Sequence, residues 1–161
     1  MNKRFNKQQI LQILSEVKDP EIPVISLEEL GIIRNVEIKN NIPEIIITHT
    51  YSGCPANSII ELDIRTALLK NGINDFKITT QLYPAWSTDD INKNGIDKLI
   101  EYGIAPPPKI KNRNIEEIQK VICVRCNSEN TELISNFGST ACKALYKCND
   151  CKEPFDYFKC I

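Results

Sequence analysis

The 161-residue chain contains no apolar run near the roughly 18–20 residues that a membrane-spanning helix needs. Residues 1–20 also lack the apolar core of a signal peptide. We therefore expect a cytoplasmic protein that does not bind membranes. Hydrophobic residues make up 42% of the sequence and charged residues 25%, which excludes disordered and fibrous chains. The length fits one medium domain or two small ones.

A surplus of positive charge is missing as well. The net charge is −1, and the residues after Ile104 carry 9 basic against 7 acidic side chains. A protein that binds nucleic acid needs a basic face that releases counterions from the phosphates. We therefore expect no nucleic-acid partner.

Common catalytic motifs are absent from the sequence. There is one histidine, and neither a Ser-His-Asp arrangement nor a glycine-rich phosphate loop occurs. A hydrolase that uses Cys54 as its nucleophile would have only His49 as an evident base. These absences argue against an enzyme that uses Cys54 in this way.

What the chain does have is cysteine, seven in all, and four of them form two C-x-x-C pairs. Cys123 and Cys126 make the first pair, and Cys148 and Cys151 follow after 21 residues. Two residues between cysteines let a tight turn aim both sulfurs at one ion, and two such knuckles complete a four-sulfur shell. The pattern predicts a structural zinc site, with chance packing of small apolar cysteines as the alternative.

Two further cysteines, Cys142 and Cys160, lie in the same region. They could be core thiols, alternative ligands, or members of a cluster after metal exchange. We favour packing, because a closed zinc shell has no vacancy.

The hydrophobic pattern predicts α/β architecture, with helices on one face of a small sheet. It indicates helices at 7–18, from Pro55 to Asn71, and near 96–103, with strands at 33–39, 44–49 and 76–82. The two prolines of residues 19–27 predict a stiff surface loop. Short strands are expected at 131–137, 144–147 and 155–159.

Composition also suggests how the chain is divided. Three consecutive prolines followed by basic residues predict a linker at 105–114, because proline resists helix and stays extended. Residues 1–104 then form the α/β domain, and residues 115–161 form a small zinc ribbon. So short a ribbon buries little apolar surface, and bound metal would supply the missing folding energy.

Cys54 is the second notable thiol. Its predicted position is the N-cap of the helix that follows, where backbone N–H groups and the helix dipole lower a thiol pKa. It could be a reactive thiolate, an open metal ligand, or a buried structural cysteine. His49 could be a second ligand, although an ordinary hydrogen bond at the strand end is the favoured interpretation.

Three segments resemble the iron–sulfur assembly family of SufT-type proteins. They are Asp19–Val24, Glu29–Val36 and Thr50–Ala56. This resemblance implies a two-layer α+β domain in which Cys54 is the functional cysteine. It also implies Asp19 and Glu21 as helpers, with solvated loop charges as the alternative. His49 departs from the pattern, in which a small residue or proline is more usual.

Three more segments resemble one branch of that family, the PaaD accessory subunits of phenylacetyl-CoA epoxidase. They are Ala85–Asp89, Glu101–Pro107 and Phe137–Tyr146. The resemblance covers nearly the whole chain. It implies a non-catalytic role in phenylacetate catabolism, assisting iron–sulfur or metal maturation of the reductase component of this multicomponent monooxygenase.

Because one cysteine precedes the ribbon, a transient cluster at Cys54 would need a client, a small thiol or a second chain, which makes a homodimer conceivable. The alternative function is electron transfer through iron in the four-cysteine site. Iron sites of that kind usually carry glycine just after each knuckle, where this chain has Asn127 and Lys152. The sequence therefore favours zinc.

Overall fold

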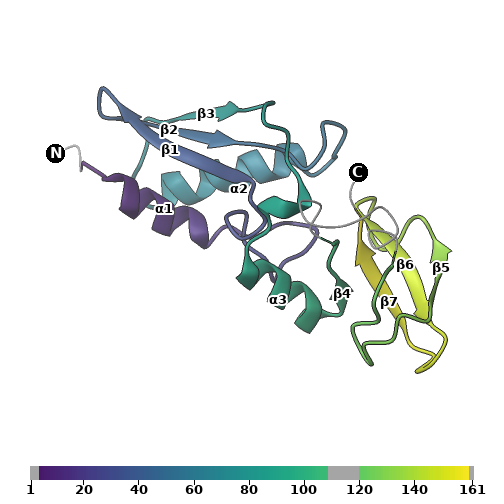
Figure 1. The fold of residues 1–161 in the computed structure, drawn as a ribbon. Coiled ribbons are helices and arrows are strands. Elements are labelled where there is room, and N and C mark those ends of the chain that lie inside the picture. Colours follow the sequence, from purple (N-terminus) through teal and green to yellow (C-terminus); the bar gives the residue numbers. More distant parts are fainter. Residues whose placement is uncertain (1–3, 109–119, 160–161) are drawn as a thin grey trace. The chain divides into compact units, whose positions relative to one another are not determined.

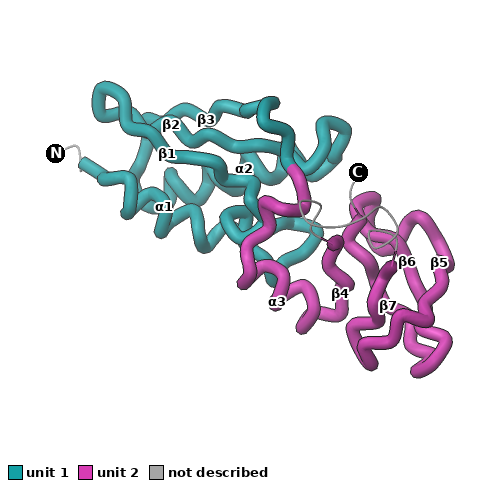
Figure 2. The backbone as a smooth tube through the Cα atoms, viewed as in Figure 1, with its two compact units in different colours: residues 1–86 teal, residues 87–161 magenta. Residues whose placement is uncertain are grey.

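The computed structural model describes residues 4–108 and 120–159. The chain divides into two compact units, residues 1–86 and residues 87–161 (Figure 2). Among the described residues, no helix is long and apolar enough to cross a membrane.

The first unit is a three-stranded sheet with two helices on one face (Figure 1). Its strands are β1 (Ile33–Lys39), β2 (Ile42–Ile47) and β3 (Lys77–Thr80), in the order β1-β2-β3. Helix α1 spans Lys7–Ser15, and α2 spans Asn57–Lys70. Strands β1 and β2 form an antiparallel hairpin, whereas β3 runs parallel to β2. The predicted α+β two-layer architecture is therefore confirmed.

Local chemistry explains several boundaries in this unit. Asn6 caps α1 in a capping box with Gln9, which satisfies backbone N–H groups at the start of the helix. Asn40 and Asn41 both have positive φ, the conformation that a tight two-residue hairpin requires and that asparagine tolerates. Strand β2 consequently begins at Ile42, two residues before the predicted start. Gly72 ends α2 with φ +82°.

The core of the first unit lies between the helices and the sheet. Alternate residues of the strands and one stripe of each helix are buried, as two packed layers require. These side chains are Ile10, Leu14, Val36, Ile45, Ile47, Ile60, Ile64 and Leu68.

The segment 19–27, predicted as a surface loop, is instead largely buried. Ile22, Ile25 and Leu27 are at most 1% exposed. The chain folds back on itself here, because Leu27 N–H donates to the Val17 carbonyl and Asp19 N–H to the Ile25 carbonyl. The apolar residues of this segment gain more from burial than from contact with solvent, which explains why it packs into the core.

Within its described residues, the second unit contains one α-helix, a short 3-10 helix at Thr88–Asp90 and a four-stranded sheet. Helix α3 spans Lys93–Tyr102 and ends at Gly103, where φ is +90°. The strands are β4 (Ile104–Ala105), β5 (Thr131–Ser135), β6 (Lys143–Cys148) and β7 (Pro154–Phe158), in the order β4-β7-β6-β5. Strand β4 runs parallel to β7, and the other pairs are antiparallel.

The core of this sheet is small, which bears on its need for a metal. One cluster of buried side chains in it consists of Ala105, Val121, Cys123, Cys148 and Phe155. The Tyr146 ring stacks on Phe155 with centroids 6.1 Å apart. Because two of the five buried side chains are cysteines of the C-x-x-C pairs, this core is continuous with the predicted metal site.

The structure also bears on the predicted linker. Ala105, its first residue, lies in β4 and pairs with Tyr157 of β7. Residues 109–114 of the predicted linker lie outside the described residues. The division into 1–104 and 115–161 stays a prediction.

Candidate metal centre and reactive thiol

The four cysteines of the C-x-x-C pairs come together in the second unit. Their Sγ atoms all lie within 4.8 Å of one another. Those of Cys123 and Cys151 are 3.7 Å apart, and those of Cys126 and Cys148 are 3.5 Å apart. With Zn–S bonds of about 2.3 Å, a tetrahedral site has sulfurs about 3.8 Å apart. The set therefore fits a tetrahedral metal ion.

Both knuckles share one backbone geometry. Asn127 follows Cys126 with φ +61°, and Lys152 follows Cys151 with φ +67°. In the first knuckle, the N–H of Arg125 donates to the Cys123 sulfur at 3.4 Å, and the N–H of Asn127 to the Cys123 carbonyl at 2.9 Å. Such N–H donors stabilise thiolate ligands.

The electrostatics of the four sulfurs favour a bound cation. Backbone N–H groups of Cys151 and Asp150 lower the pKa of Cys148 to about 6. The pKa of Cys126 rises to about 12, although the Ser128 N–H lowers it, because neighbouring sulfurs and burial disfavour a second negative charge. Four adjacent thiolates would repel one another, and a divalent cation removes that repulsion. The donor set thus suits a bound metal.

A polar bridge between the knuckles supports the site. The Asp150 carboxylate accepts hydrogen bonds from the Ser128 hydroxyl and from Asn130 Nδ2. These two hydrogen bonds, the Ser128 one first, hold the pKa of Asp150 below its ordinary value. Sequence reasoning did not identify this bridge. The sequence does contain an indication of it, because short polar residues stand beside each C-x-x-C pair. The side chains of such residues commonly form hydrogen bonds within nearby turns.

Cys142 and Cys160 were expected to be packed thiols. Cys142 is buried, and its sulfur lies 3.0 Å from the Thr140 hydroxyl oxygen, outside the four-sulfur group. Cys160 lies outside the described residues. The roles of both thiols stay predictions.

Cys54 does not occupy the predicted N-cap. Helix α2 begins at Asn57 with Ala56 as its N-cap, so Cys54 lies two residues earlier, in a turn where the Asn57 N–H donates to the Cys54 carbonyl. Pro55 is consequently outside the helix rather than at its first position. Cys54 is partly exposed.

The predicted lowering of the Cys54 pKa is wrong. Burial is the main cause that raises it, and the negative charges of Glu21 and Asp19 raise it further. The Ala56 N–H and the Tyr51 hydroxyl act in the opposite direction but do not compensate. The thiol is therefore protonated at neutral pH. The sequence could not show this, because the acidic residues lie far from Cys54 along the chain.

The two predicted helper residues have different environments. Asp19 is 7% exposed, and its Oδ1 accepts the N–H groups of Glu21 and Ile22, both at 2.8 Å. It is therefore not a solvated loop charge but part of the turn that holds residues 19–22. Glu21 is half-buried. Both carboxylates act electrostatically on Cys54, so the structure brings all three side chains into one region.

His49 interacts with α2. Its Nε2 lies 3.8 Å from Glu61 Oε1, and burial lowers its pKa, partly offset by that carboxylate. In the part of the chain that the structure describes, the one group of three or more side chains suited to a metal is the four-cysteine set. His49 and Cys54 therefore form no metal site there with a third ligand.

Two families match different parts of the chain. Residues 7–75 match the family described as iron–sulfur cluster assembly protein, and residues 107–159 match the PaaD zinc beta ribbon domain. The chain is 47% identical over 153 residues to a putative 1,2-phenylacetyl-CoA epoxidase subunit of Escherichia coli K12, covering 95% of this chain and 92% of that protein. The chain belongs to the PaaD family.

Two more distant relatives of this PaaD-family protein each match part of the chain. An iron–sulfur cluster carrier protein of Deinococcus radiodurans is 37% identical over 70 residues, which are 43% of this chain and 20% of that protein. A solved Bacillus anthracis domain of unknown function, DUF59, superposes with a TM-score of 0.54 at 26% identity. The alignment covers 58% of this chain and 90% of that domain.

Proposed function

We propose that this chain is a non-catalytic accessory subunit of ring-1,2-phenylacetyl-CoA epoxidase, the multicomponent monooxygenase of phenylacetate catabolism. In that role it assists assembly of the iron–sulfur cluster of the reductase component, in the cytoplasm, where thiols stay reduced. One observation carries the proposal. The 47% identity to an epoxidase subunit extends over both units, and the segment that matches the iron–sulfur assembly family contains Cys54.

The environment of Cys54 suits a cluster that is held briefly as cargo. The thiol exchanges with a thiolate already bound to the cluster, and its proton leaves with the displaced thiol. The Glu21 and Asp19 carboxylates that raise the Cys54 pKa also repel a negatively charged, thiolate-ligated cluster. A single ligand in such surroundings binds weakly, which favours transfer to a client over retention.

The ribbon, in this proposal, holds zinc as a structural ion and serves to dock the chain. Electron transfer through iron is the competing function. The left-handed positions after both knuckles support zinc, since Asn127 and Lys152 stand where iron sites usually carry glycine.

The test compares wild type, Cys54→Ala and Cys142→Ala in cells that lack the native protein. Cys142 is the matched control, because it is also a cysteine outside the four-sulfur group but lies in the second unit. The reductase component is purified anaerobically from each strain, and its iron content and visible absorption are measured.

We expect Cys54→Ala to yield reductase deficient in iron and Cys142→Ala to match wild type. A fully loaded reductase in the Cys54→Ala strain would overturn the cluster-transfer role. The same purification identifies the ribbon metal in the accessory protein. About one zinc per chain supports the structural role, whereas a reddish iron spectrum supports electron transfer.

A further inference from the structure

Helix α2 is apolar on two opposite faces. One face packs into the core through Ile60, Ile64 and Leu68, whereas Ile59, Leu62 and Leu69 on the other are 47%, 59% and 51% exposed. With Thr66, these exposed residues recur at alternating spacings of three and four. That spacing is the a/d seam of a two-helix coiled coil. A solvent-exposed helix normally carries polar residues there.

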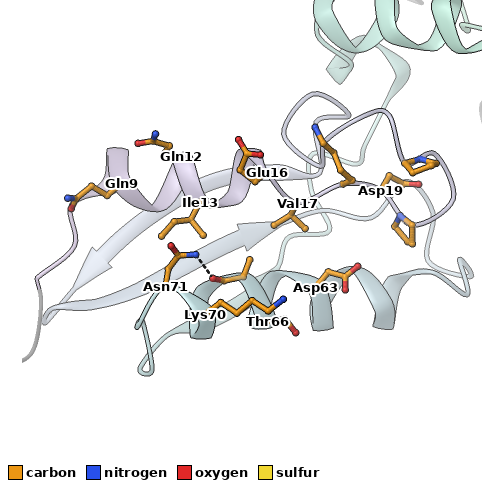
Figure 3. A pocket seen from close by; sticks show the side chains of 14 residues that line it. Gln9, Gln12, Ile13, Glu16, Val17, Asp19, Asp63, Thr66, Lys70 and Asn71 are labelled. Carbon is orange, nitrogen blue, oxygen red and sulfur yellow. Dashed lines mark hydrogen bonds between the residues drawn. The ribbon is translucent and has the colours of Figure 1, made fainter.

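Charged residues border this seam in an ordered way. On the helical geometry, Asp63 and Lys70 follow one side and Ser58 and Arg65 the other. The Arg65 guanidinium lies over the Phe76 ring, 5.8 Å from its centroid. Within the described residues, neither Asp63 nor Lys70 has an ion-pair partner. Both also line a groove of about 800 Å³ between α1 and α2 (Figure 3), so their charges are accessible.

We propose that the exposed seam of α2 (Ile59, Leu62, Thr66 and Leu69) binds α2 of a second copy of this chain in antiparallel orientation. The seam is symmetric about residue 64, so Ile59 faces Leu69 of the second copy and Leu62 faces its Thr66. Asp63 then lies beside Lys70 of the second copy, and this ion pair forms twice.

Charge favours the antiparallel orientation. In a parallel pair the two borders would face each other, placing Lys70 beside Arg65 of the second copy and leaving Asp63 opposite Ser58, so that two repulsive pairs form and no attractive one. The antiparallel pair has two Asp63–Lys70 attractions. Arg65 and Asp63 each also approach the same residue of the second copy beside the symmetry axis, which offsets part of that attraction, although each Arg65 is held over its own Phe76 ring. The seam is shorter than a standard protein interface, so we expect a dissociation constant on the order of tens of micromolar.

The orientation has a consequence for cluster chemistry beyond the proposed function. Cys54 precedes the centre of the seam by ten residues, so the two Cys54 thiols of an antiparallel dimer lie roughly 25–30 Å apart at about 1.5 Å per residue. They cannot ligate one cluster together. A cluster at Cys54 is then completed by the client or by a small thiol.

The first test measures the oligomeric state of the full, metal-loaded chain by sedimentation equilibrium across the micromolar range. Wild type should dimerise, and Leu62→Glu should raise the dissociation constant by about tenfold or more, because it places a carboxylate in the apolar seam. Leu82→Glu is the control, since Leu82 is an exposed leucine outside α2 and should not alter dimerisation.

Charge exchange tests the orientation itself. Asp63→Lys and Lys70→Asp each place two like-charged pairs in the antiparallel dimer, so each variant alone should be monomeric. In an equimolar mixture, one chain carries lysine at both positions and the other carries aspartate at both. Each cross-chain pair is then attractive, and the mixture should recover a heterodimer.

Any of three results would overturn the proposal: a wild type that is monomeric at millimolar concentration, a mixture of the two charge variants that stays monomeric, or dimerisation that Leu62→Glu leaves unaffected. None of these measurements involves an iron–sulfur cluster or the epoxidase. Failure here therefore leaves the Cys54 proposal standing, and failure of the Cys54 test leaves the dimer standing.

Discussion

Asn127 and Lys152 share a left-handed backbone conformation one residue after the second cysteine of each knuckle. The equivalence makes the two C-x-x-C turns alike although their sequences differ. Residues with a side chain meet a steric penalty in this region, and the penalty is smaller for asparagine than for lysine.

Lys152→Gly should therefore stabilise the metal-loaded ribbon by about 1 kcal/mol, because glycine adopts this φ without steric cost. Asn127→Gly should stabilise the ribbon by less, because asparagine already tolerates this conformation better than lysine does. Zinc release to a chromogenic chelator during urea unfolding would report the change. Lys147→Gly, in the regular strand β6, should instead cost about 0.5–1 kcal/mol. Equal behaviour of the glycine variants at 147 and 152 would contradict the argument.

Removal of a ligand should cost the ribbon its metal and its fold. Cys148→Ala deletes a buried sulfur that is shared between the metal site and the small core. We expect loss of about one zinc per chain and of the ordered β5–β7 signals in NMR spectra, with the first unit unchanged. Cys142→Ala should keep the metal. Retention of zinc in Cys148→Ala would show that the four sulfurs do not form the binding site.

Glu21→Gln should make Cys54 more reactive at neutral pH. The Glu21 carboxylate contributes to the raised pKa of Cys54, so its neutralisation lowers that pKa and increases the thiolate fraction. Alkylation rates of Cys54, followed from pH 6 to 10 by peptide-resolved mass spectrometry, should shift toward lower pH. An unshifted profile would mean that Glu21 has no electrostatic influence on the thiol. Glu28→Gln, at an exposed position of the same unit, provides the control.

Glu44 should make the first unit sensitive to acid. Its carboxylate accepts hydrogen bonds from the Thr79 hydroxyl at 2.7 Å and from Lys39 Nζ at 3.0 Å, and it lies 3.2 Å from Lys77 Nζ. Led by the Thr79 bond, these partners lower its pKa from 4.5 to about 2. The depressed value means that the stabilisation is fully present above pH 4.5 and is lost as pH falls toward 2.

Urea midpoints followed by Trp86 fluorescence would measure this effect. Between pH 4.5 and 2.5, wild type should lose stability faster than Glu44→Gln, and above pH 4.5 the difference between them should be constant. Both proteins carry the same ribbon, so acid release of its metal cancels in the comparison. If the urea midpoints of the two proteins fell in parallel through the acid range, Glu44 would not be the source of the acid sensitivity.

Features that depend on neighbouring residues along the chain could be predicted before the structure was known. Two C-x-x-C pairs predicted the four-sulfur group, because each pair closes within a single turn. The hydrophobic periods predicted both helices of the first unit and its hairpin, and the helix predicted to end at Asn71 does end there, with Asn71 as the C-cap of α2. These features are governed by local sterics and by one-sided burial, which short segments already encode.

Features that depend on residues far apart in the sequence became evident only in the folded protein. The parallel pairing of β3 with β2, the β4 pairing with β7 and the burial of residues 19–27 all arise from contacts between remote segments. The raised pKa of Cys54 has the same origin, because residues 19–21 fold back toward the start of α2. Burial and electrostatic interaction depend on distance in space, and a linear sequence does not specify which distant side chains come within a few ångströms of each other.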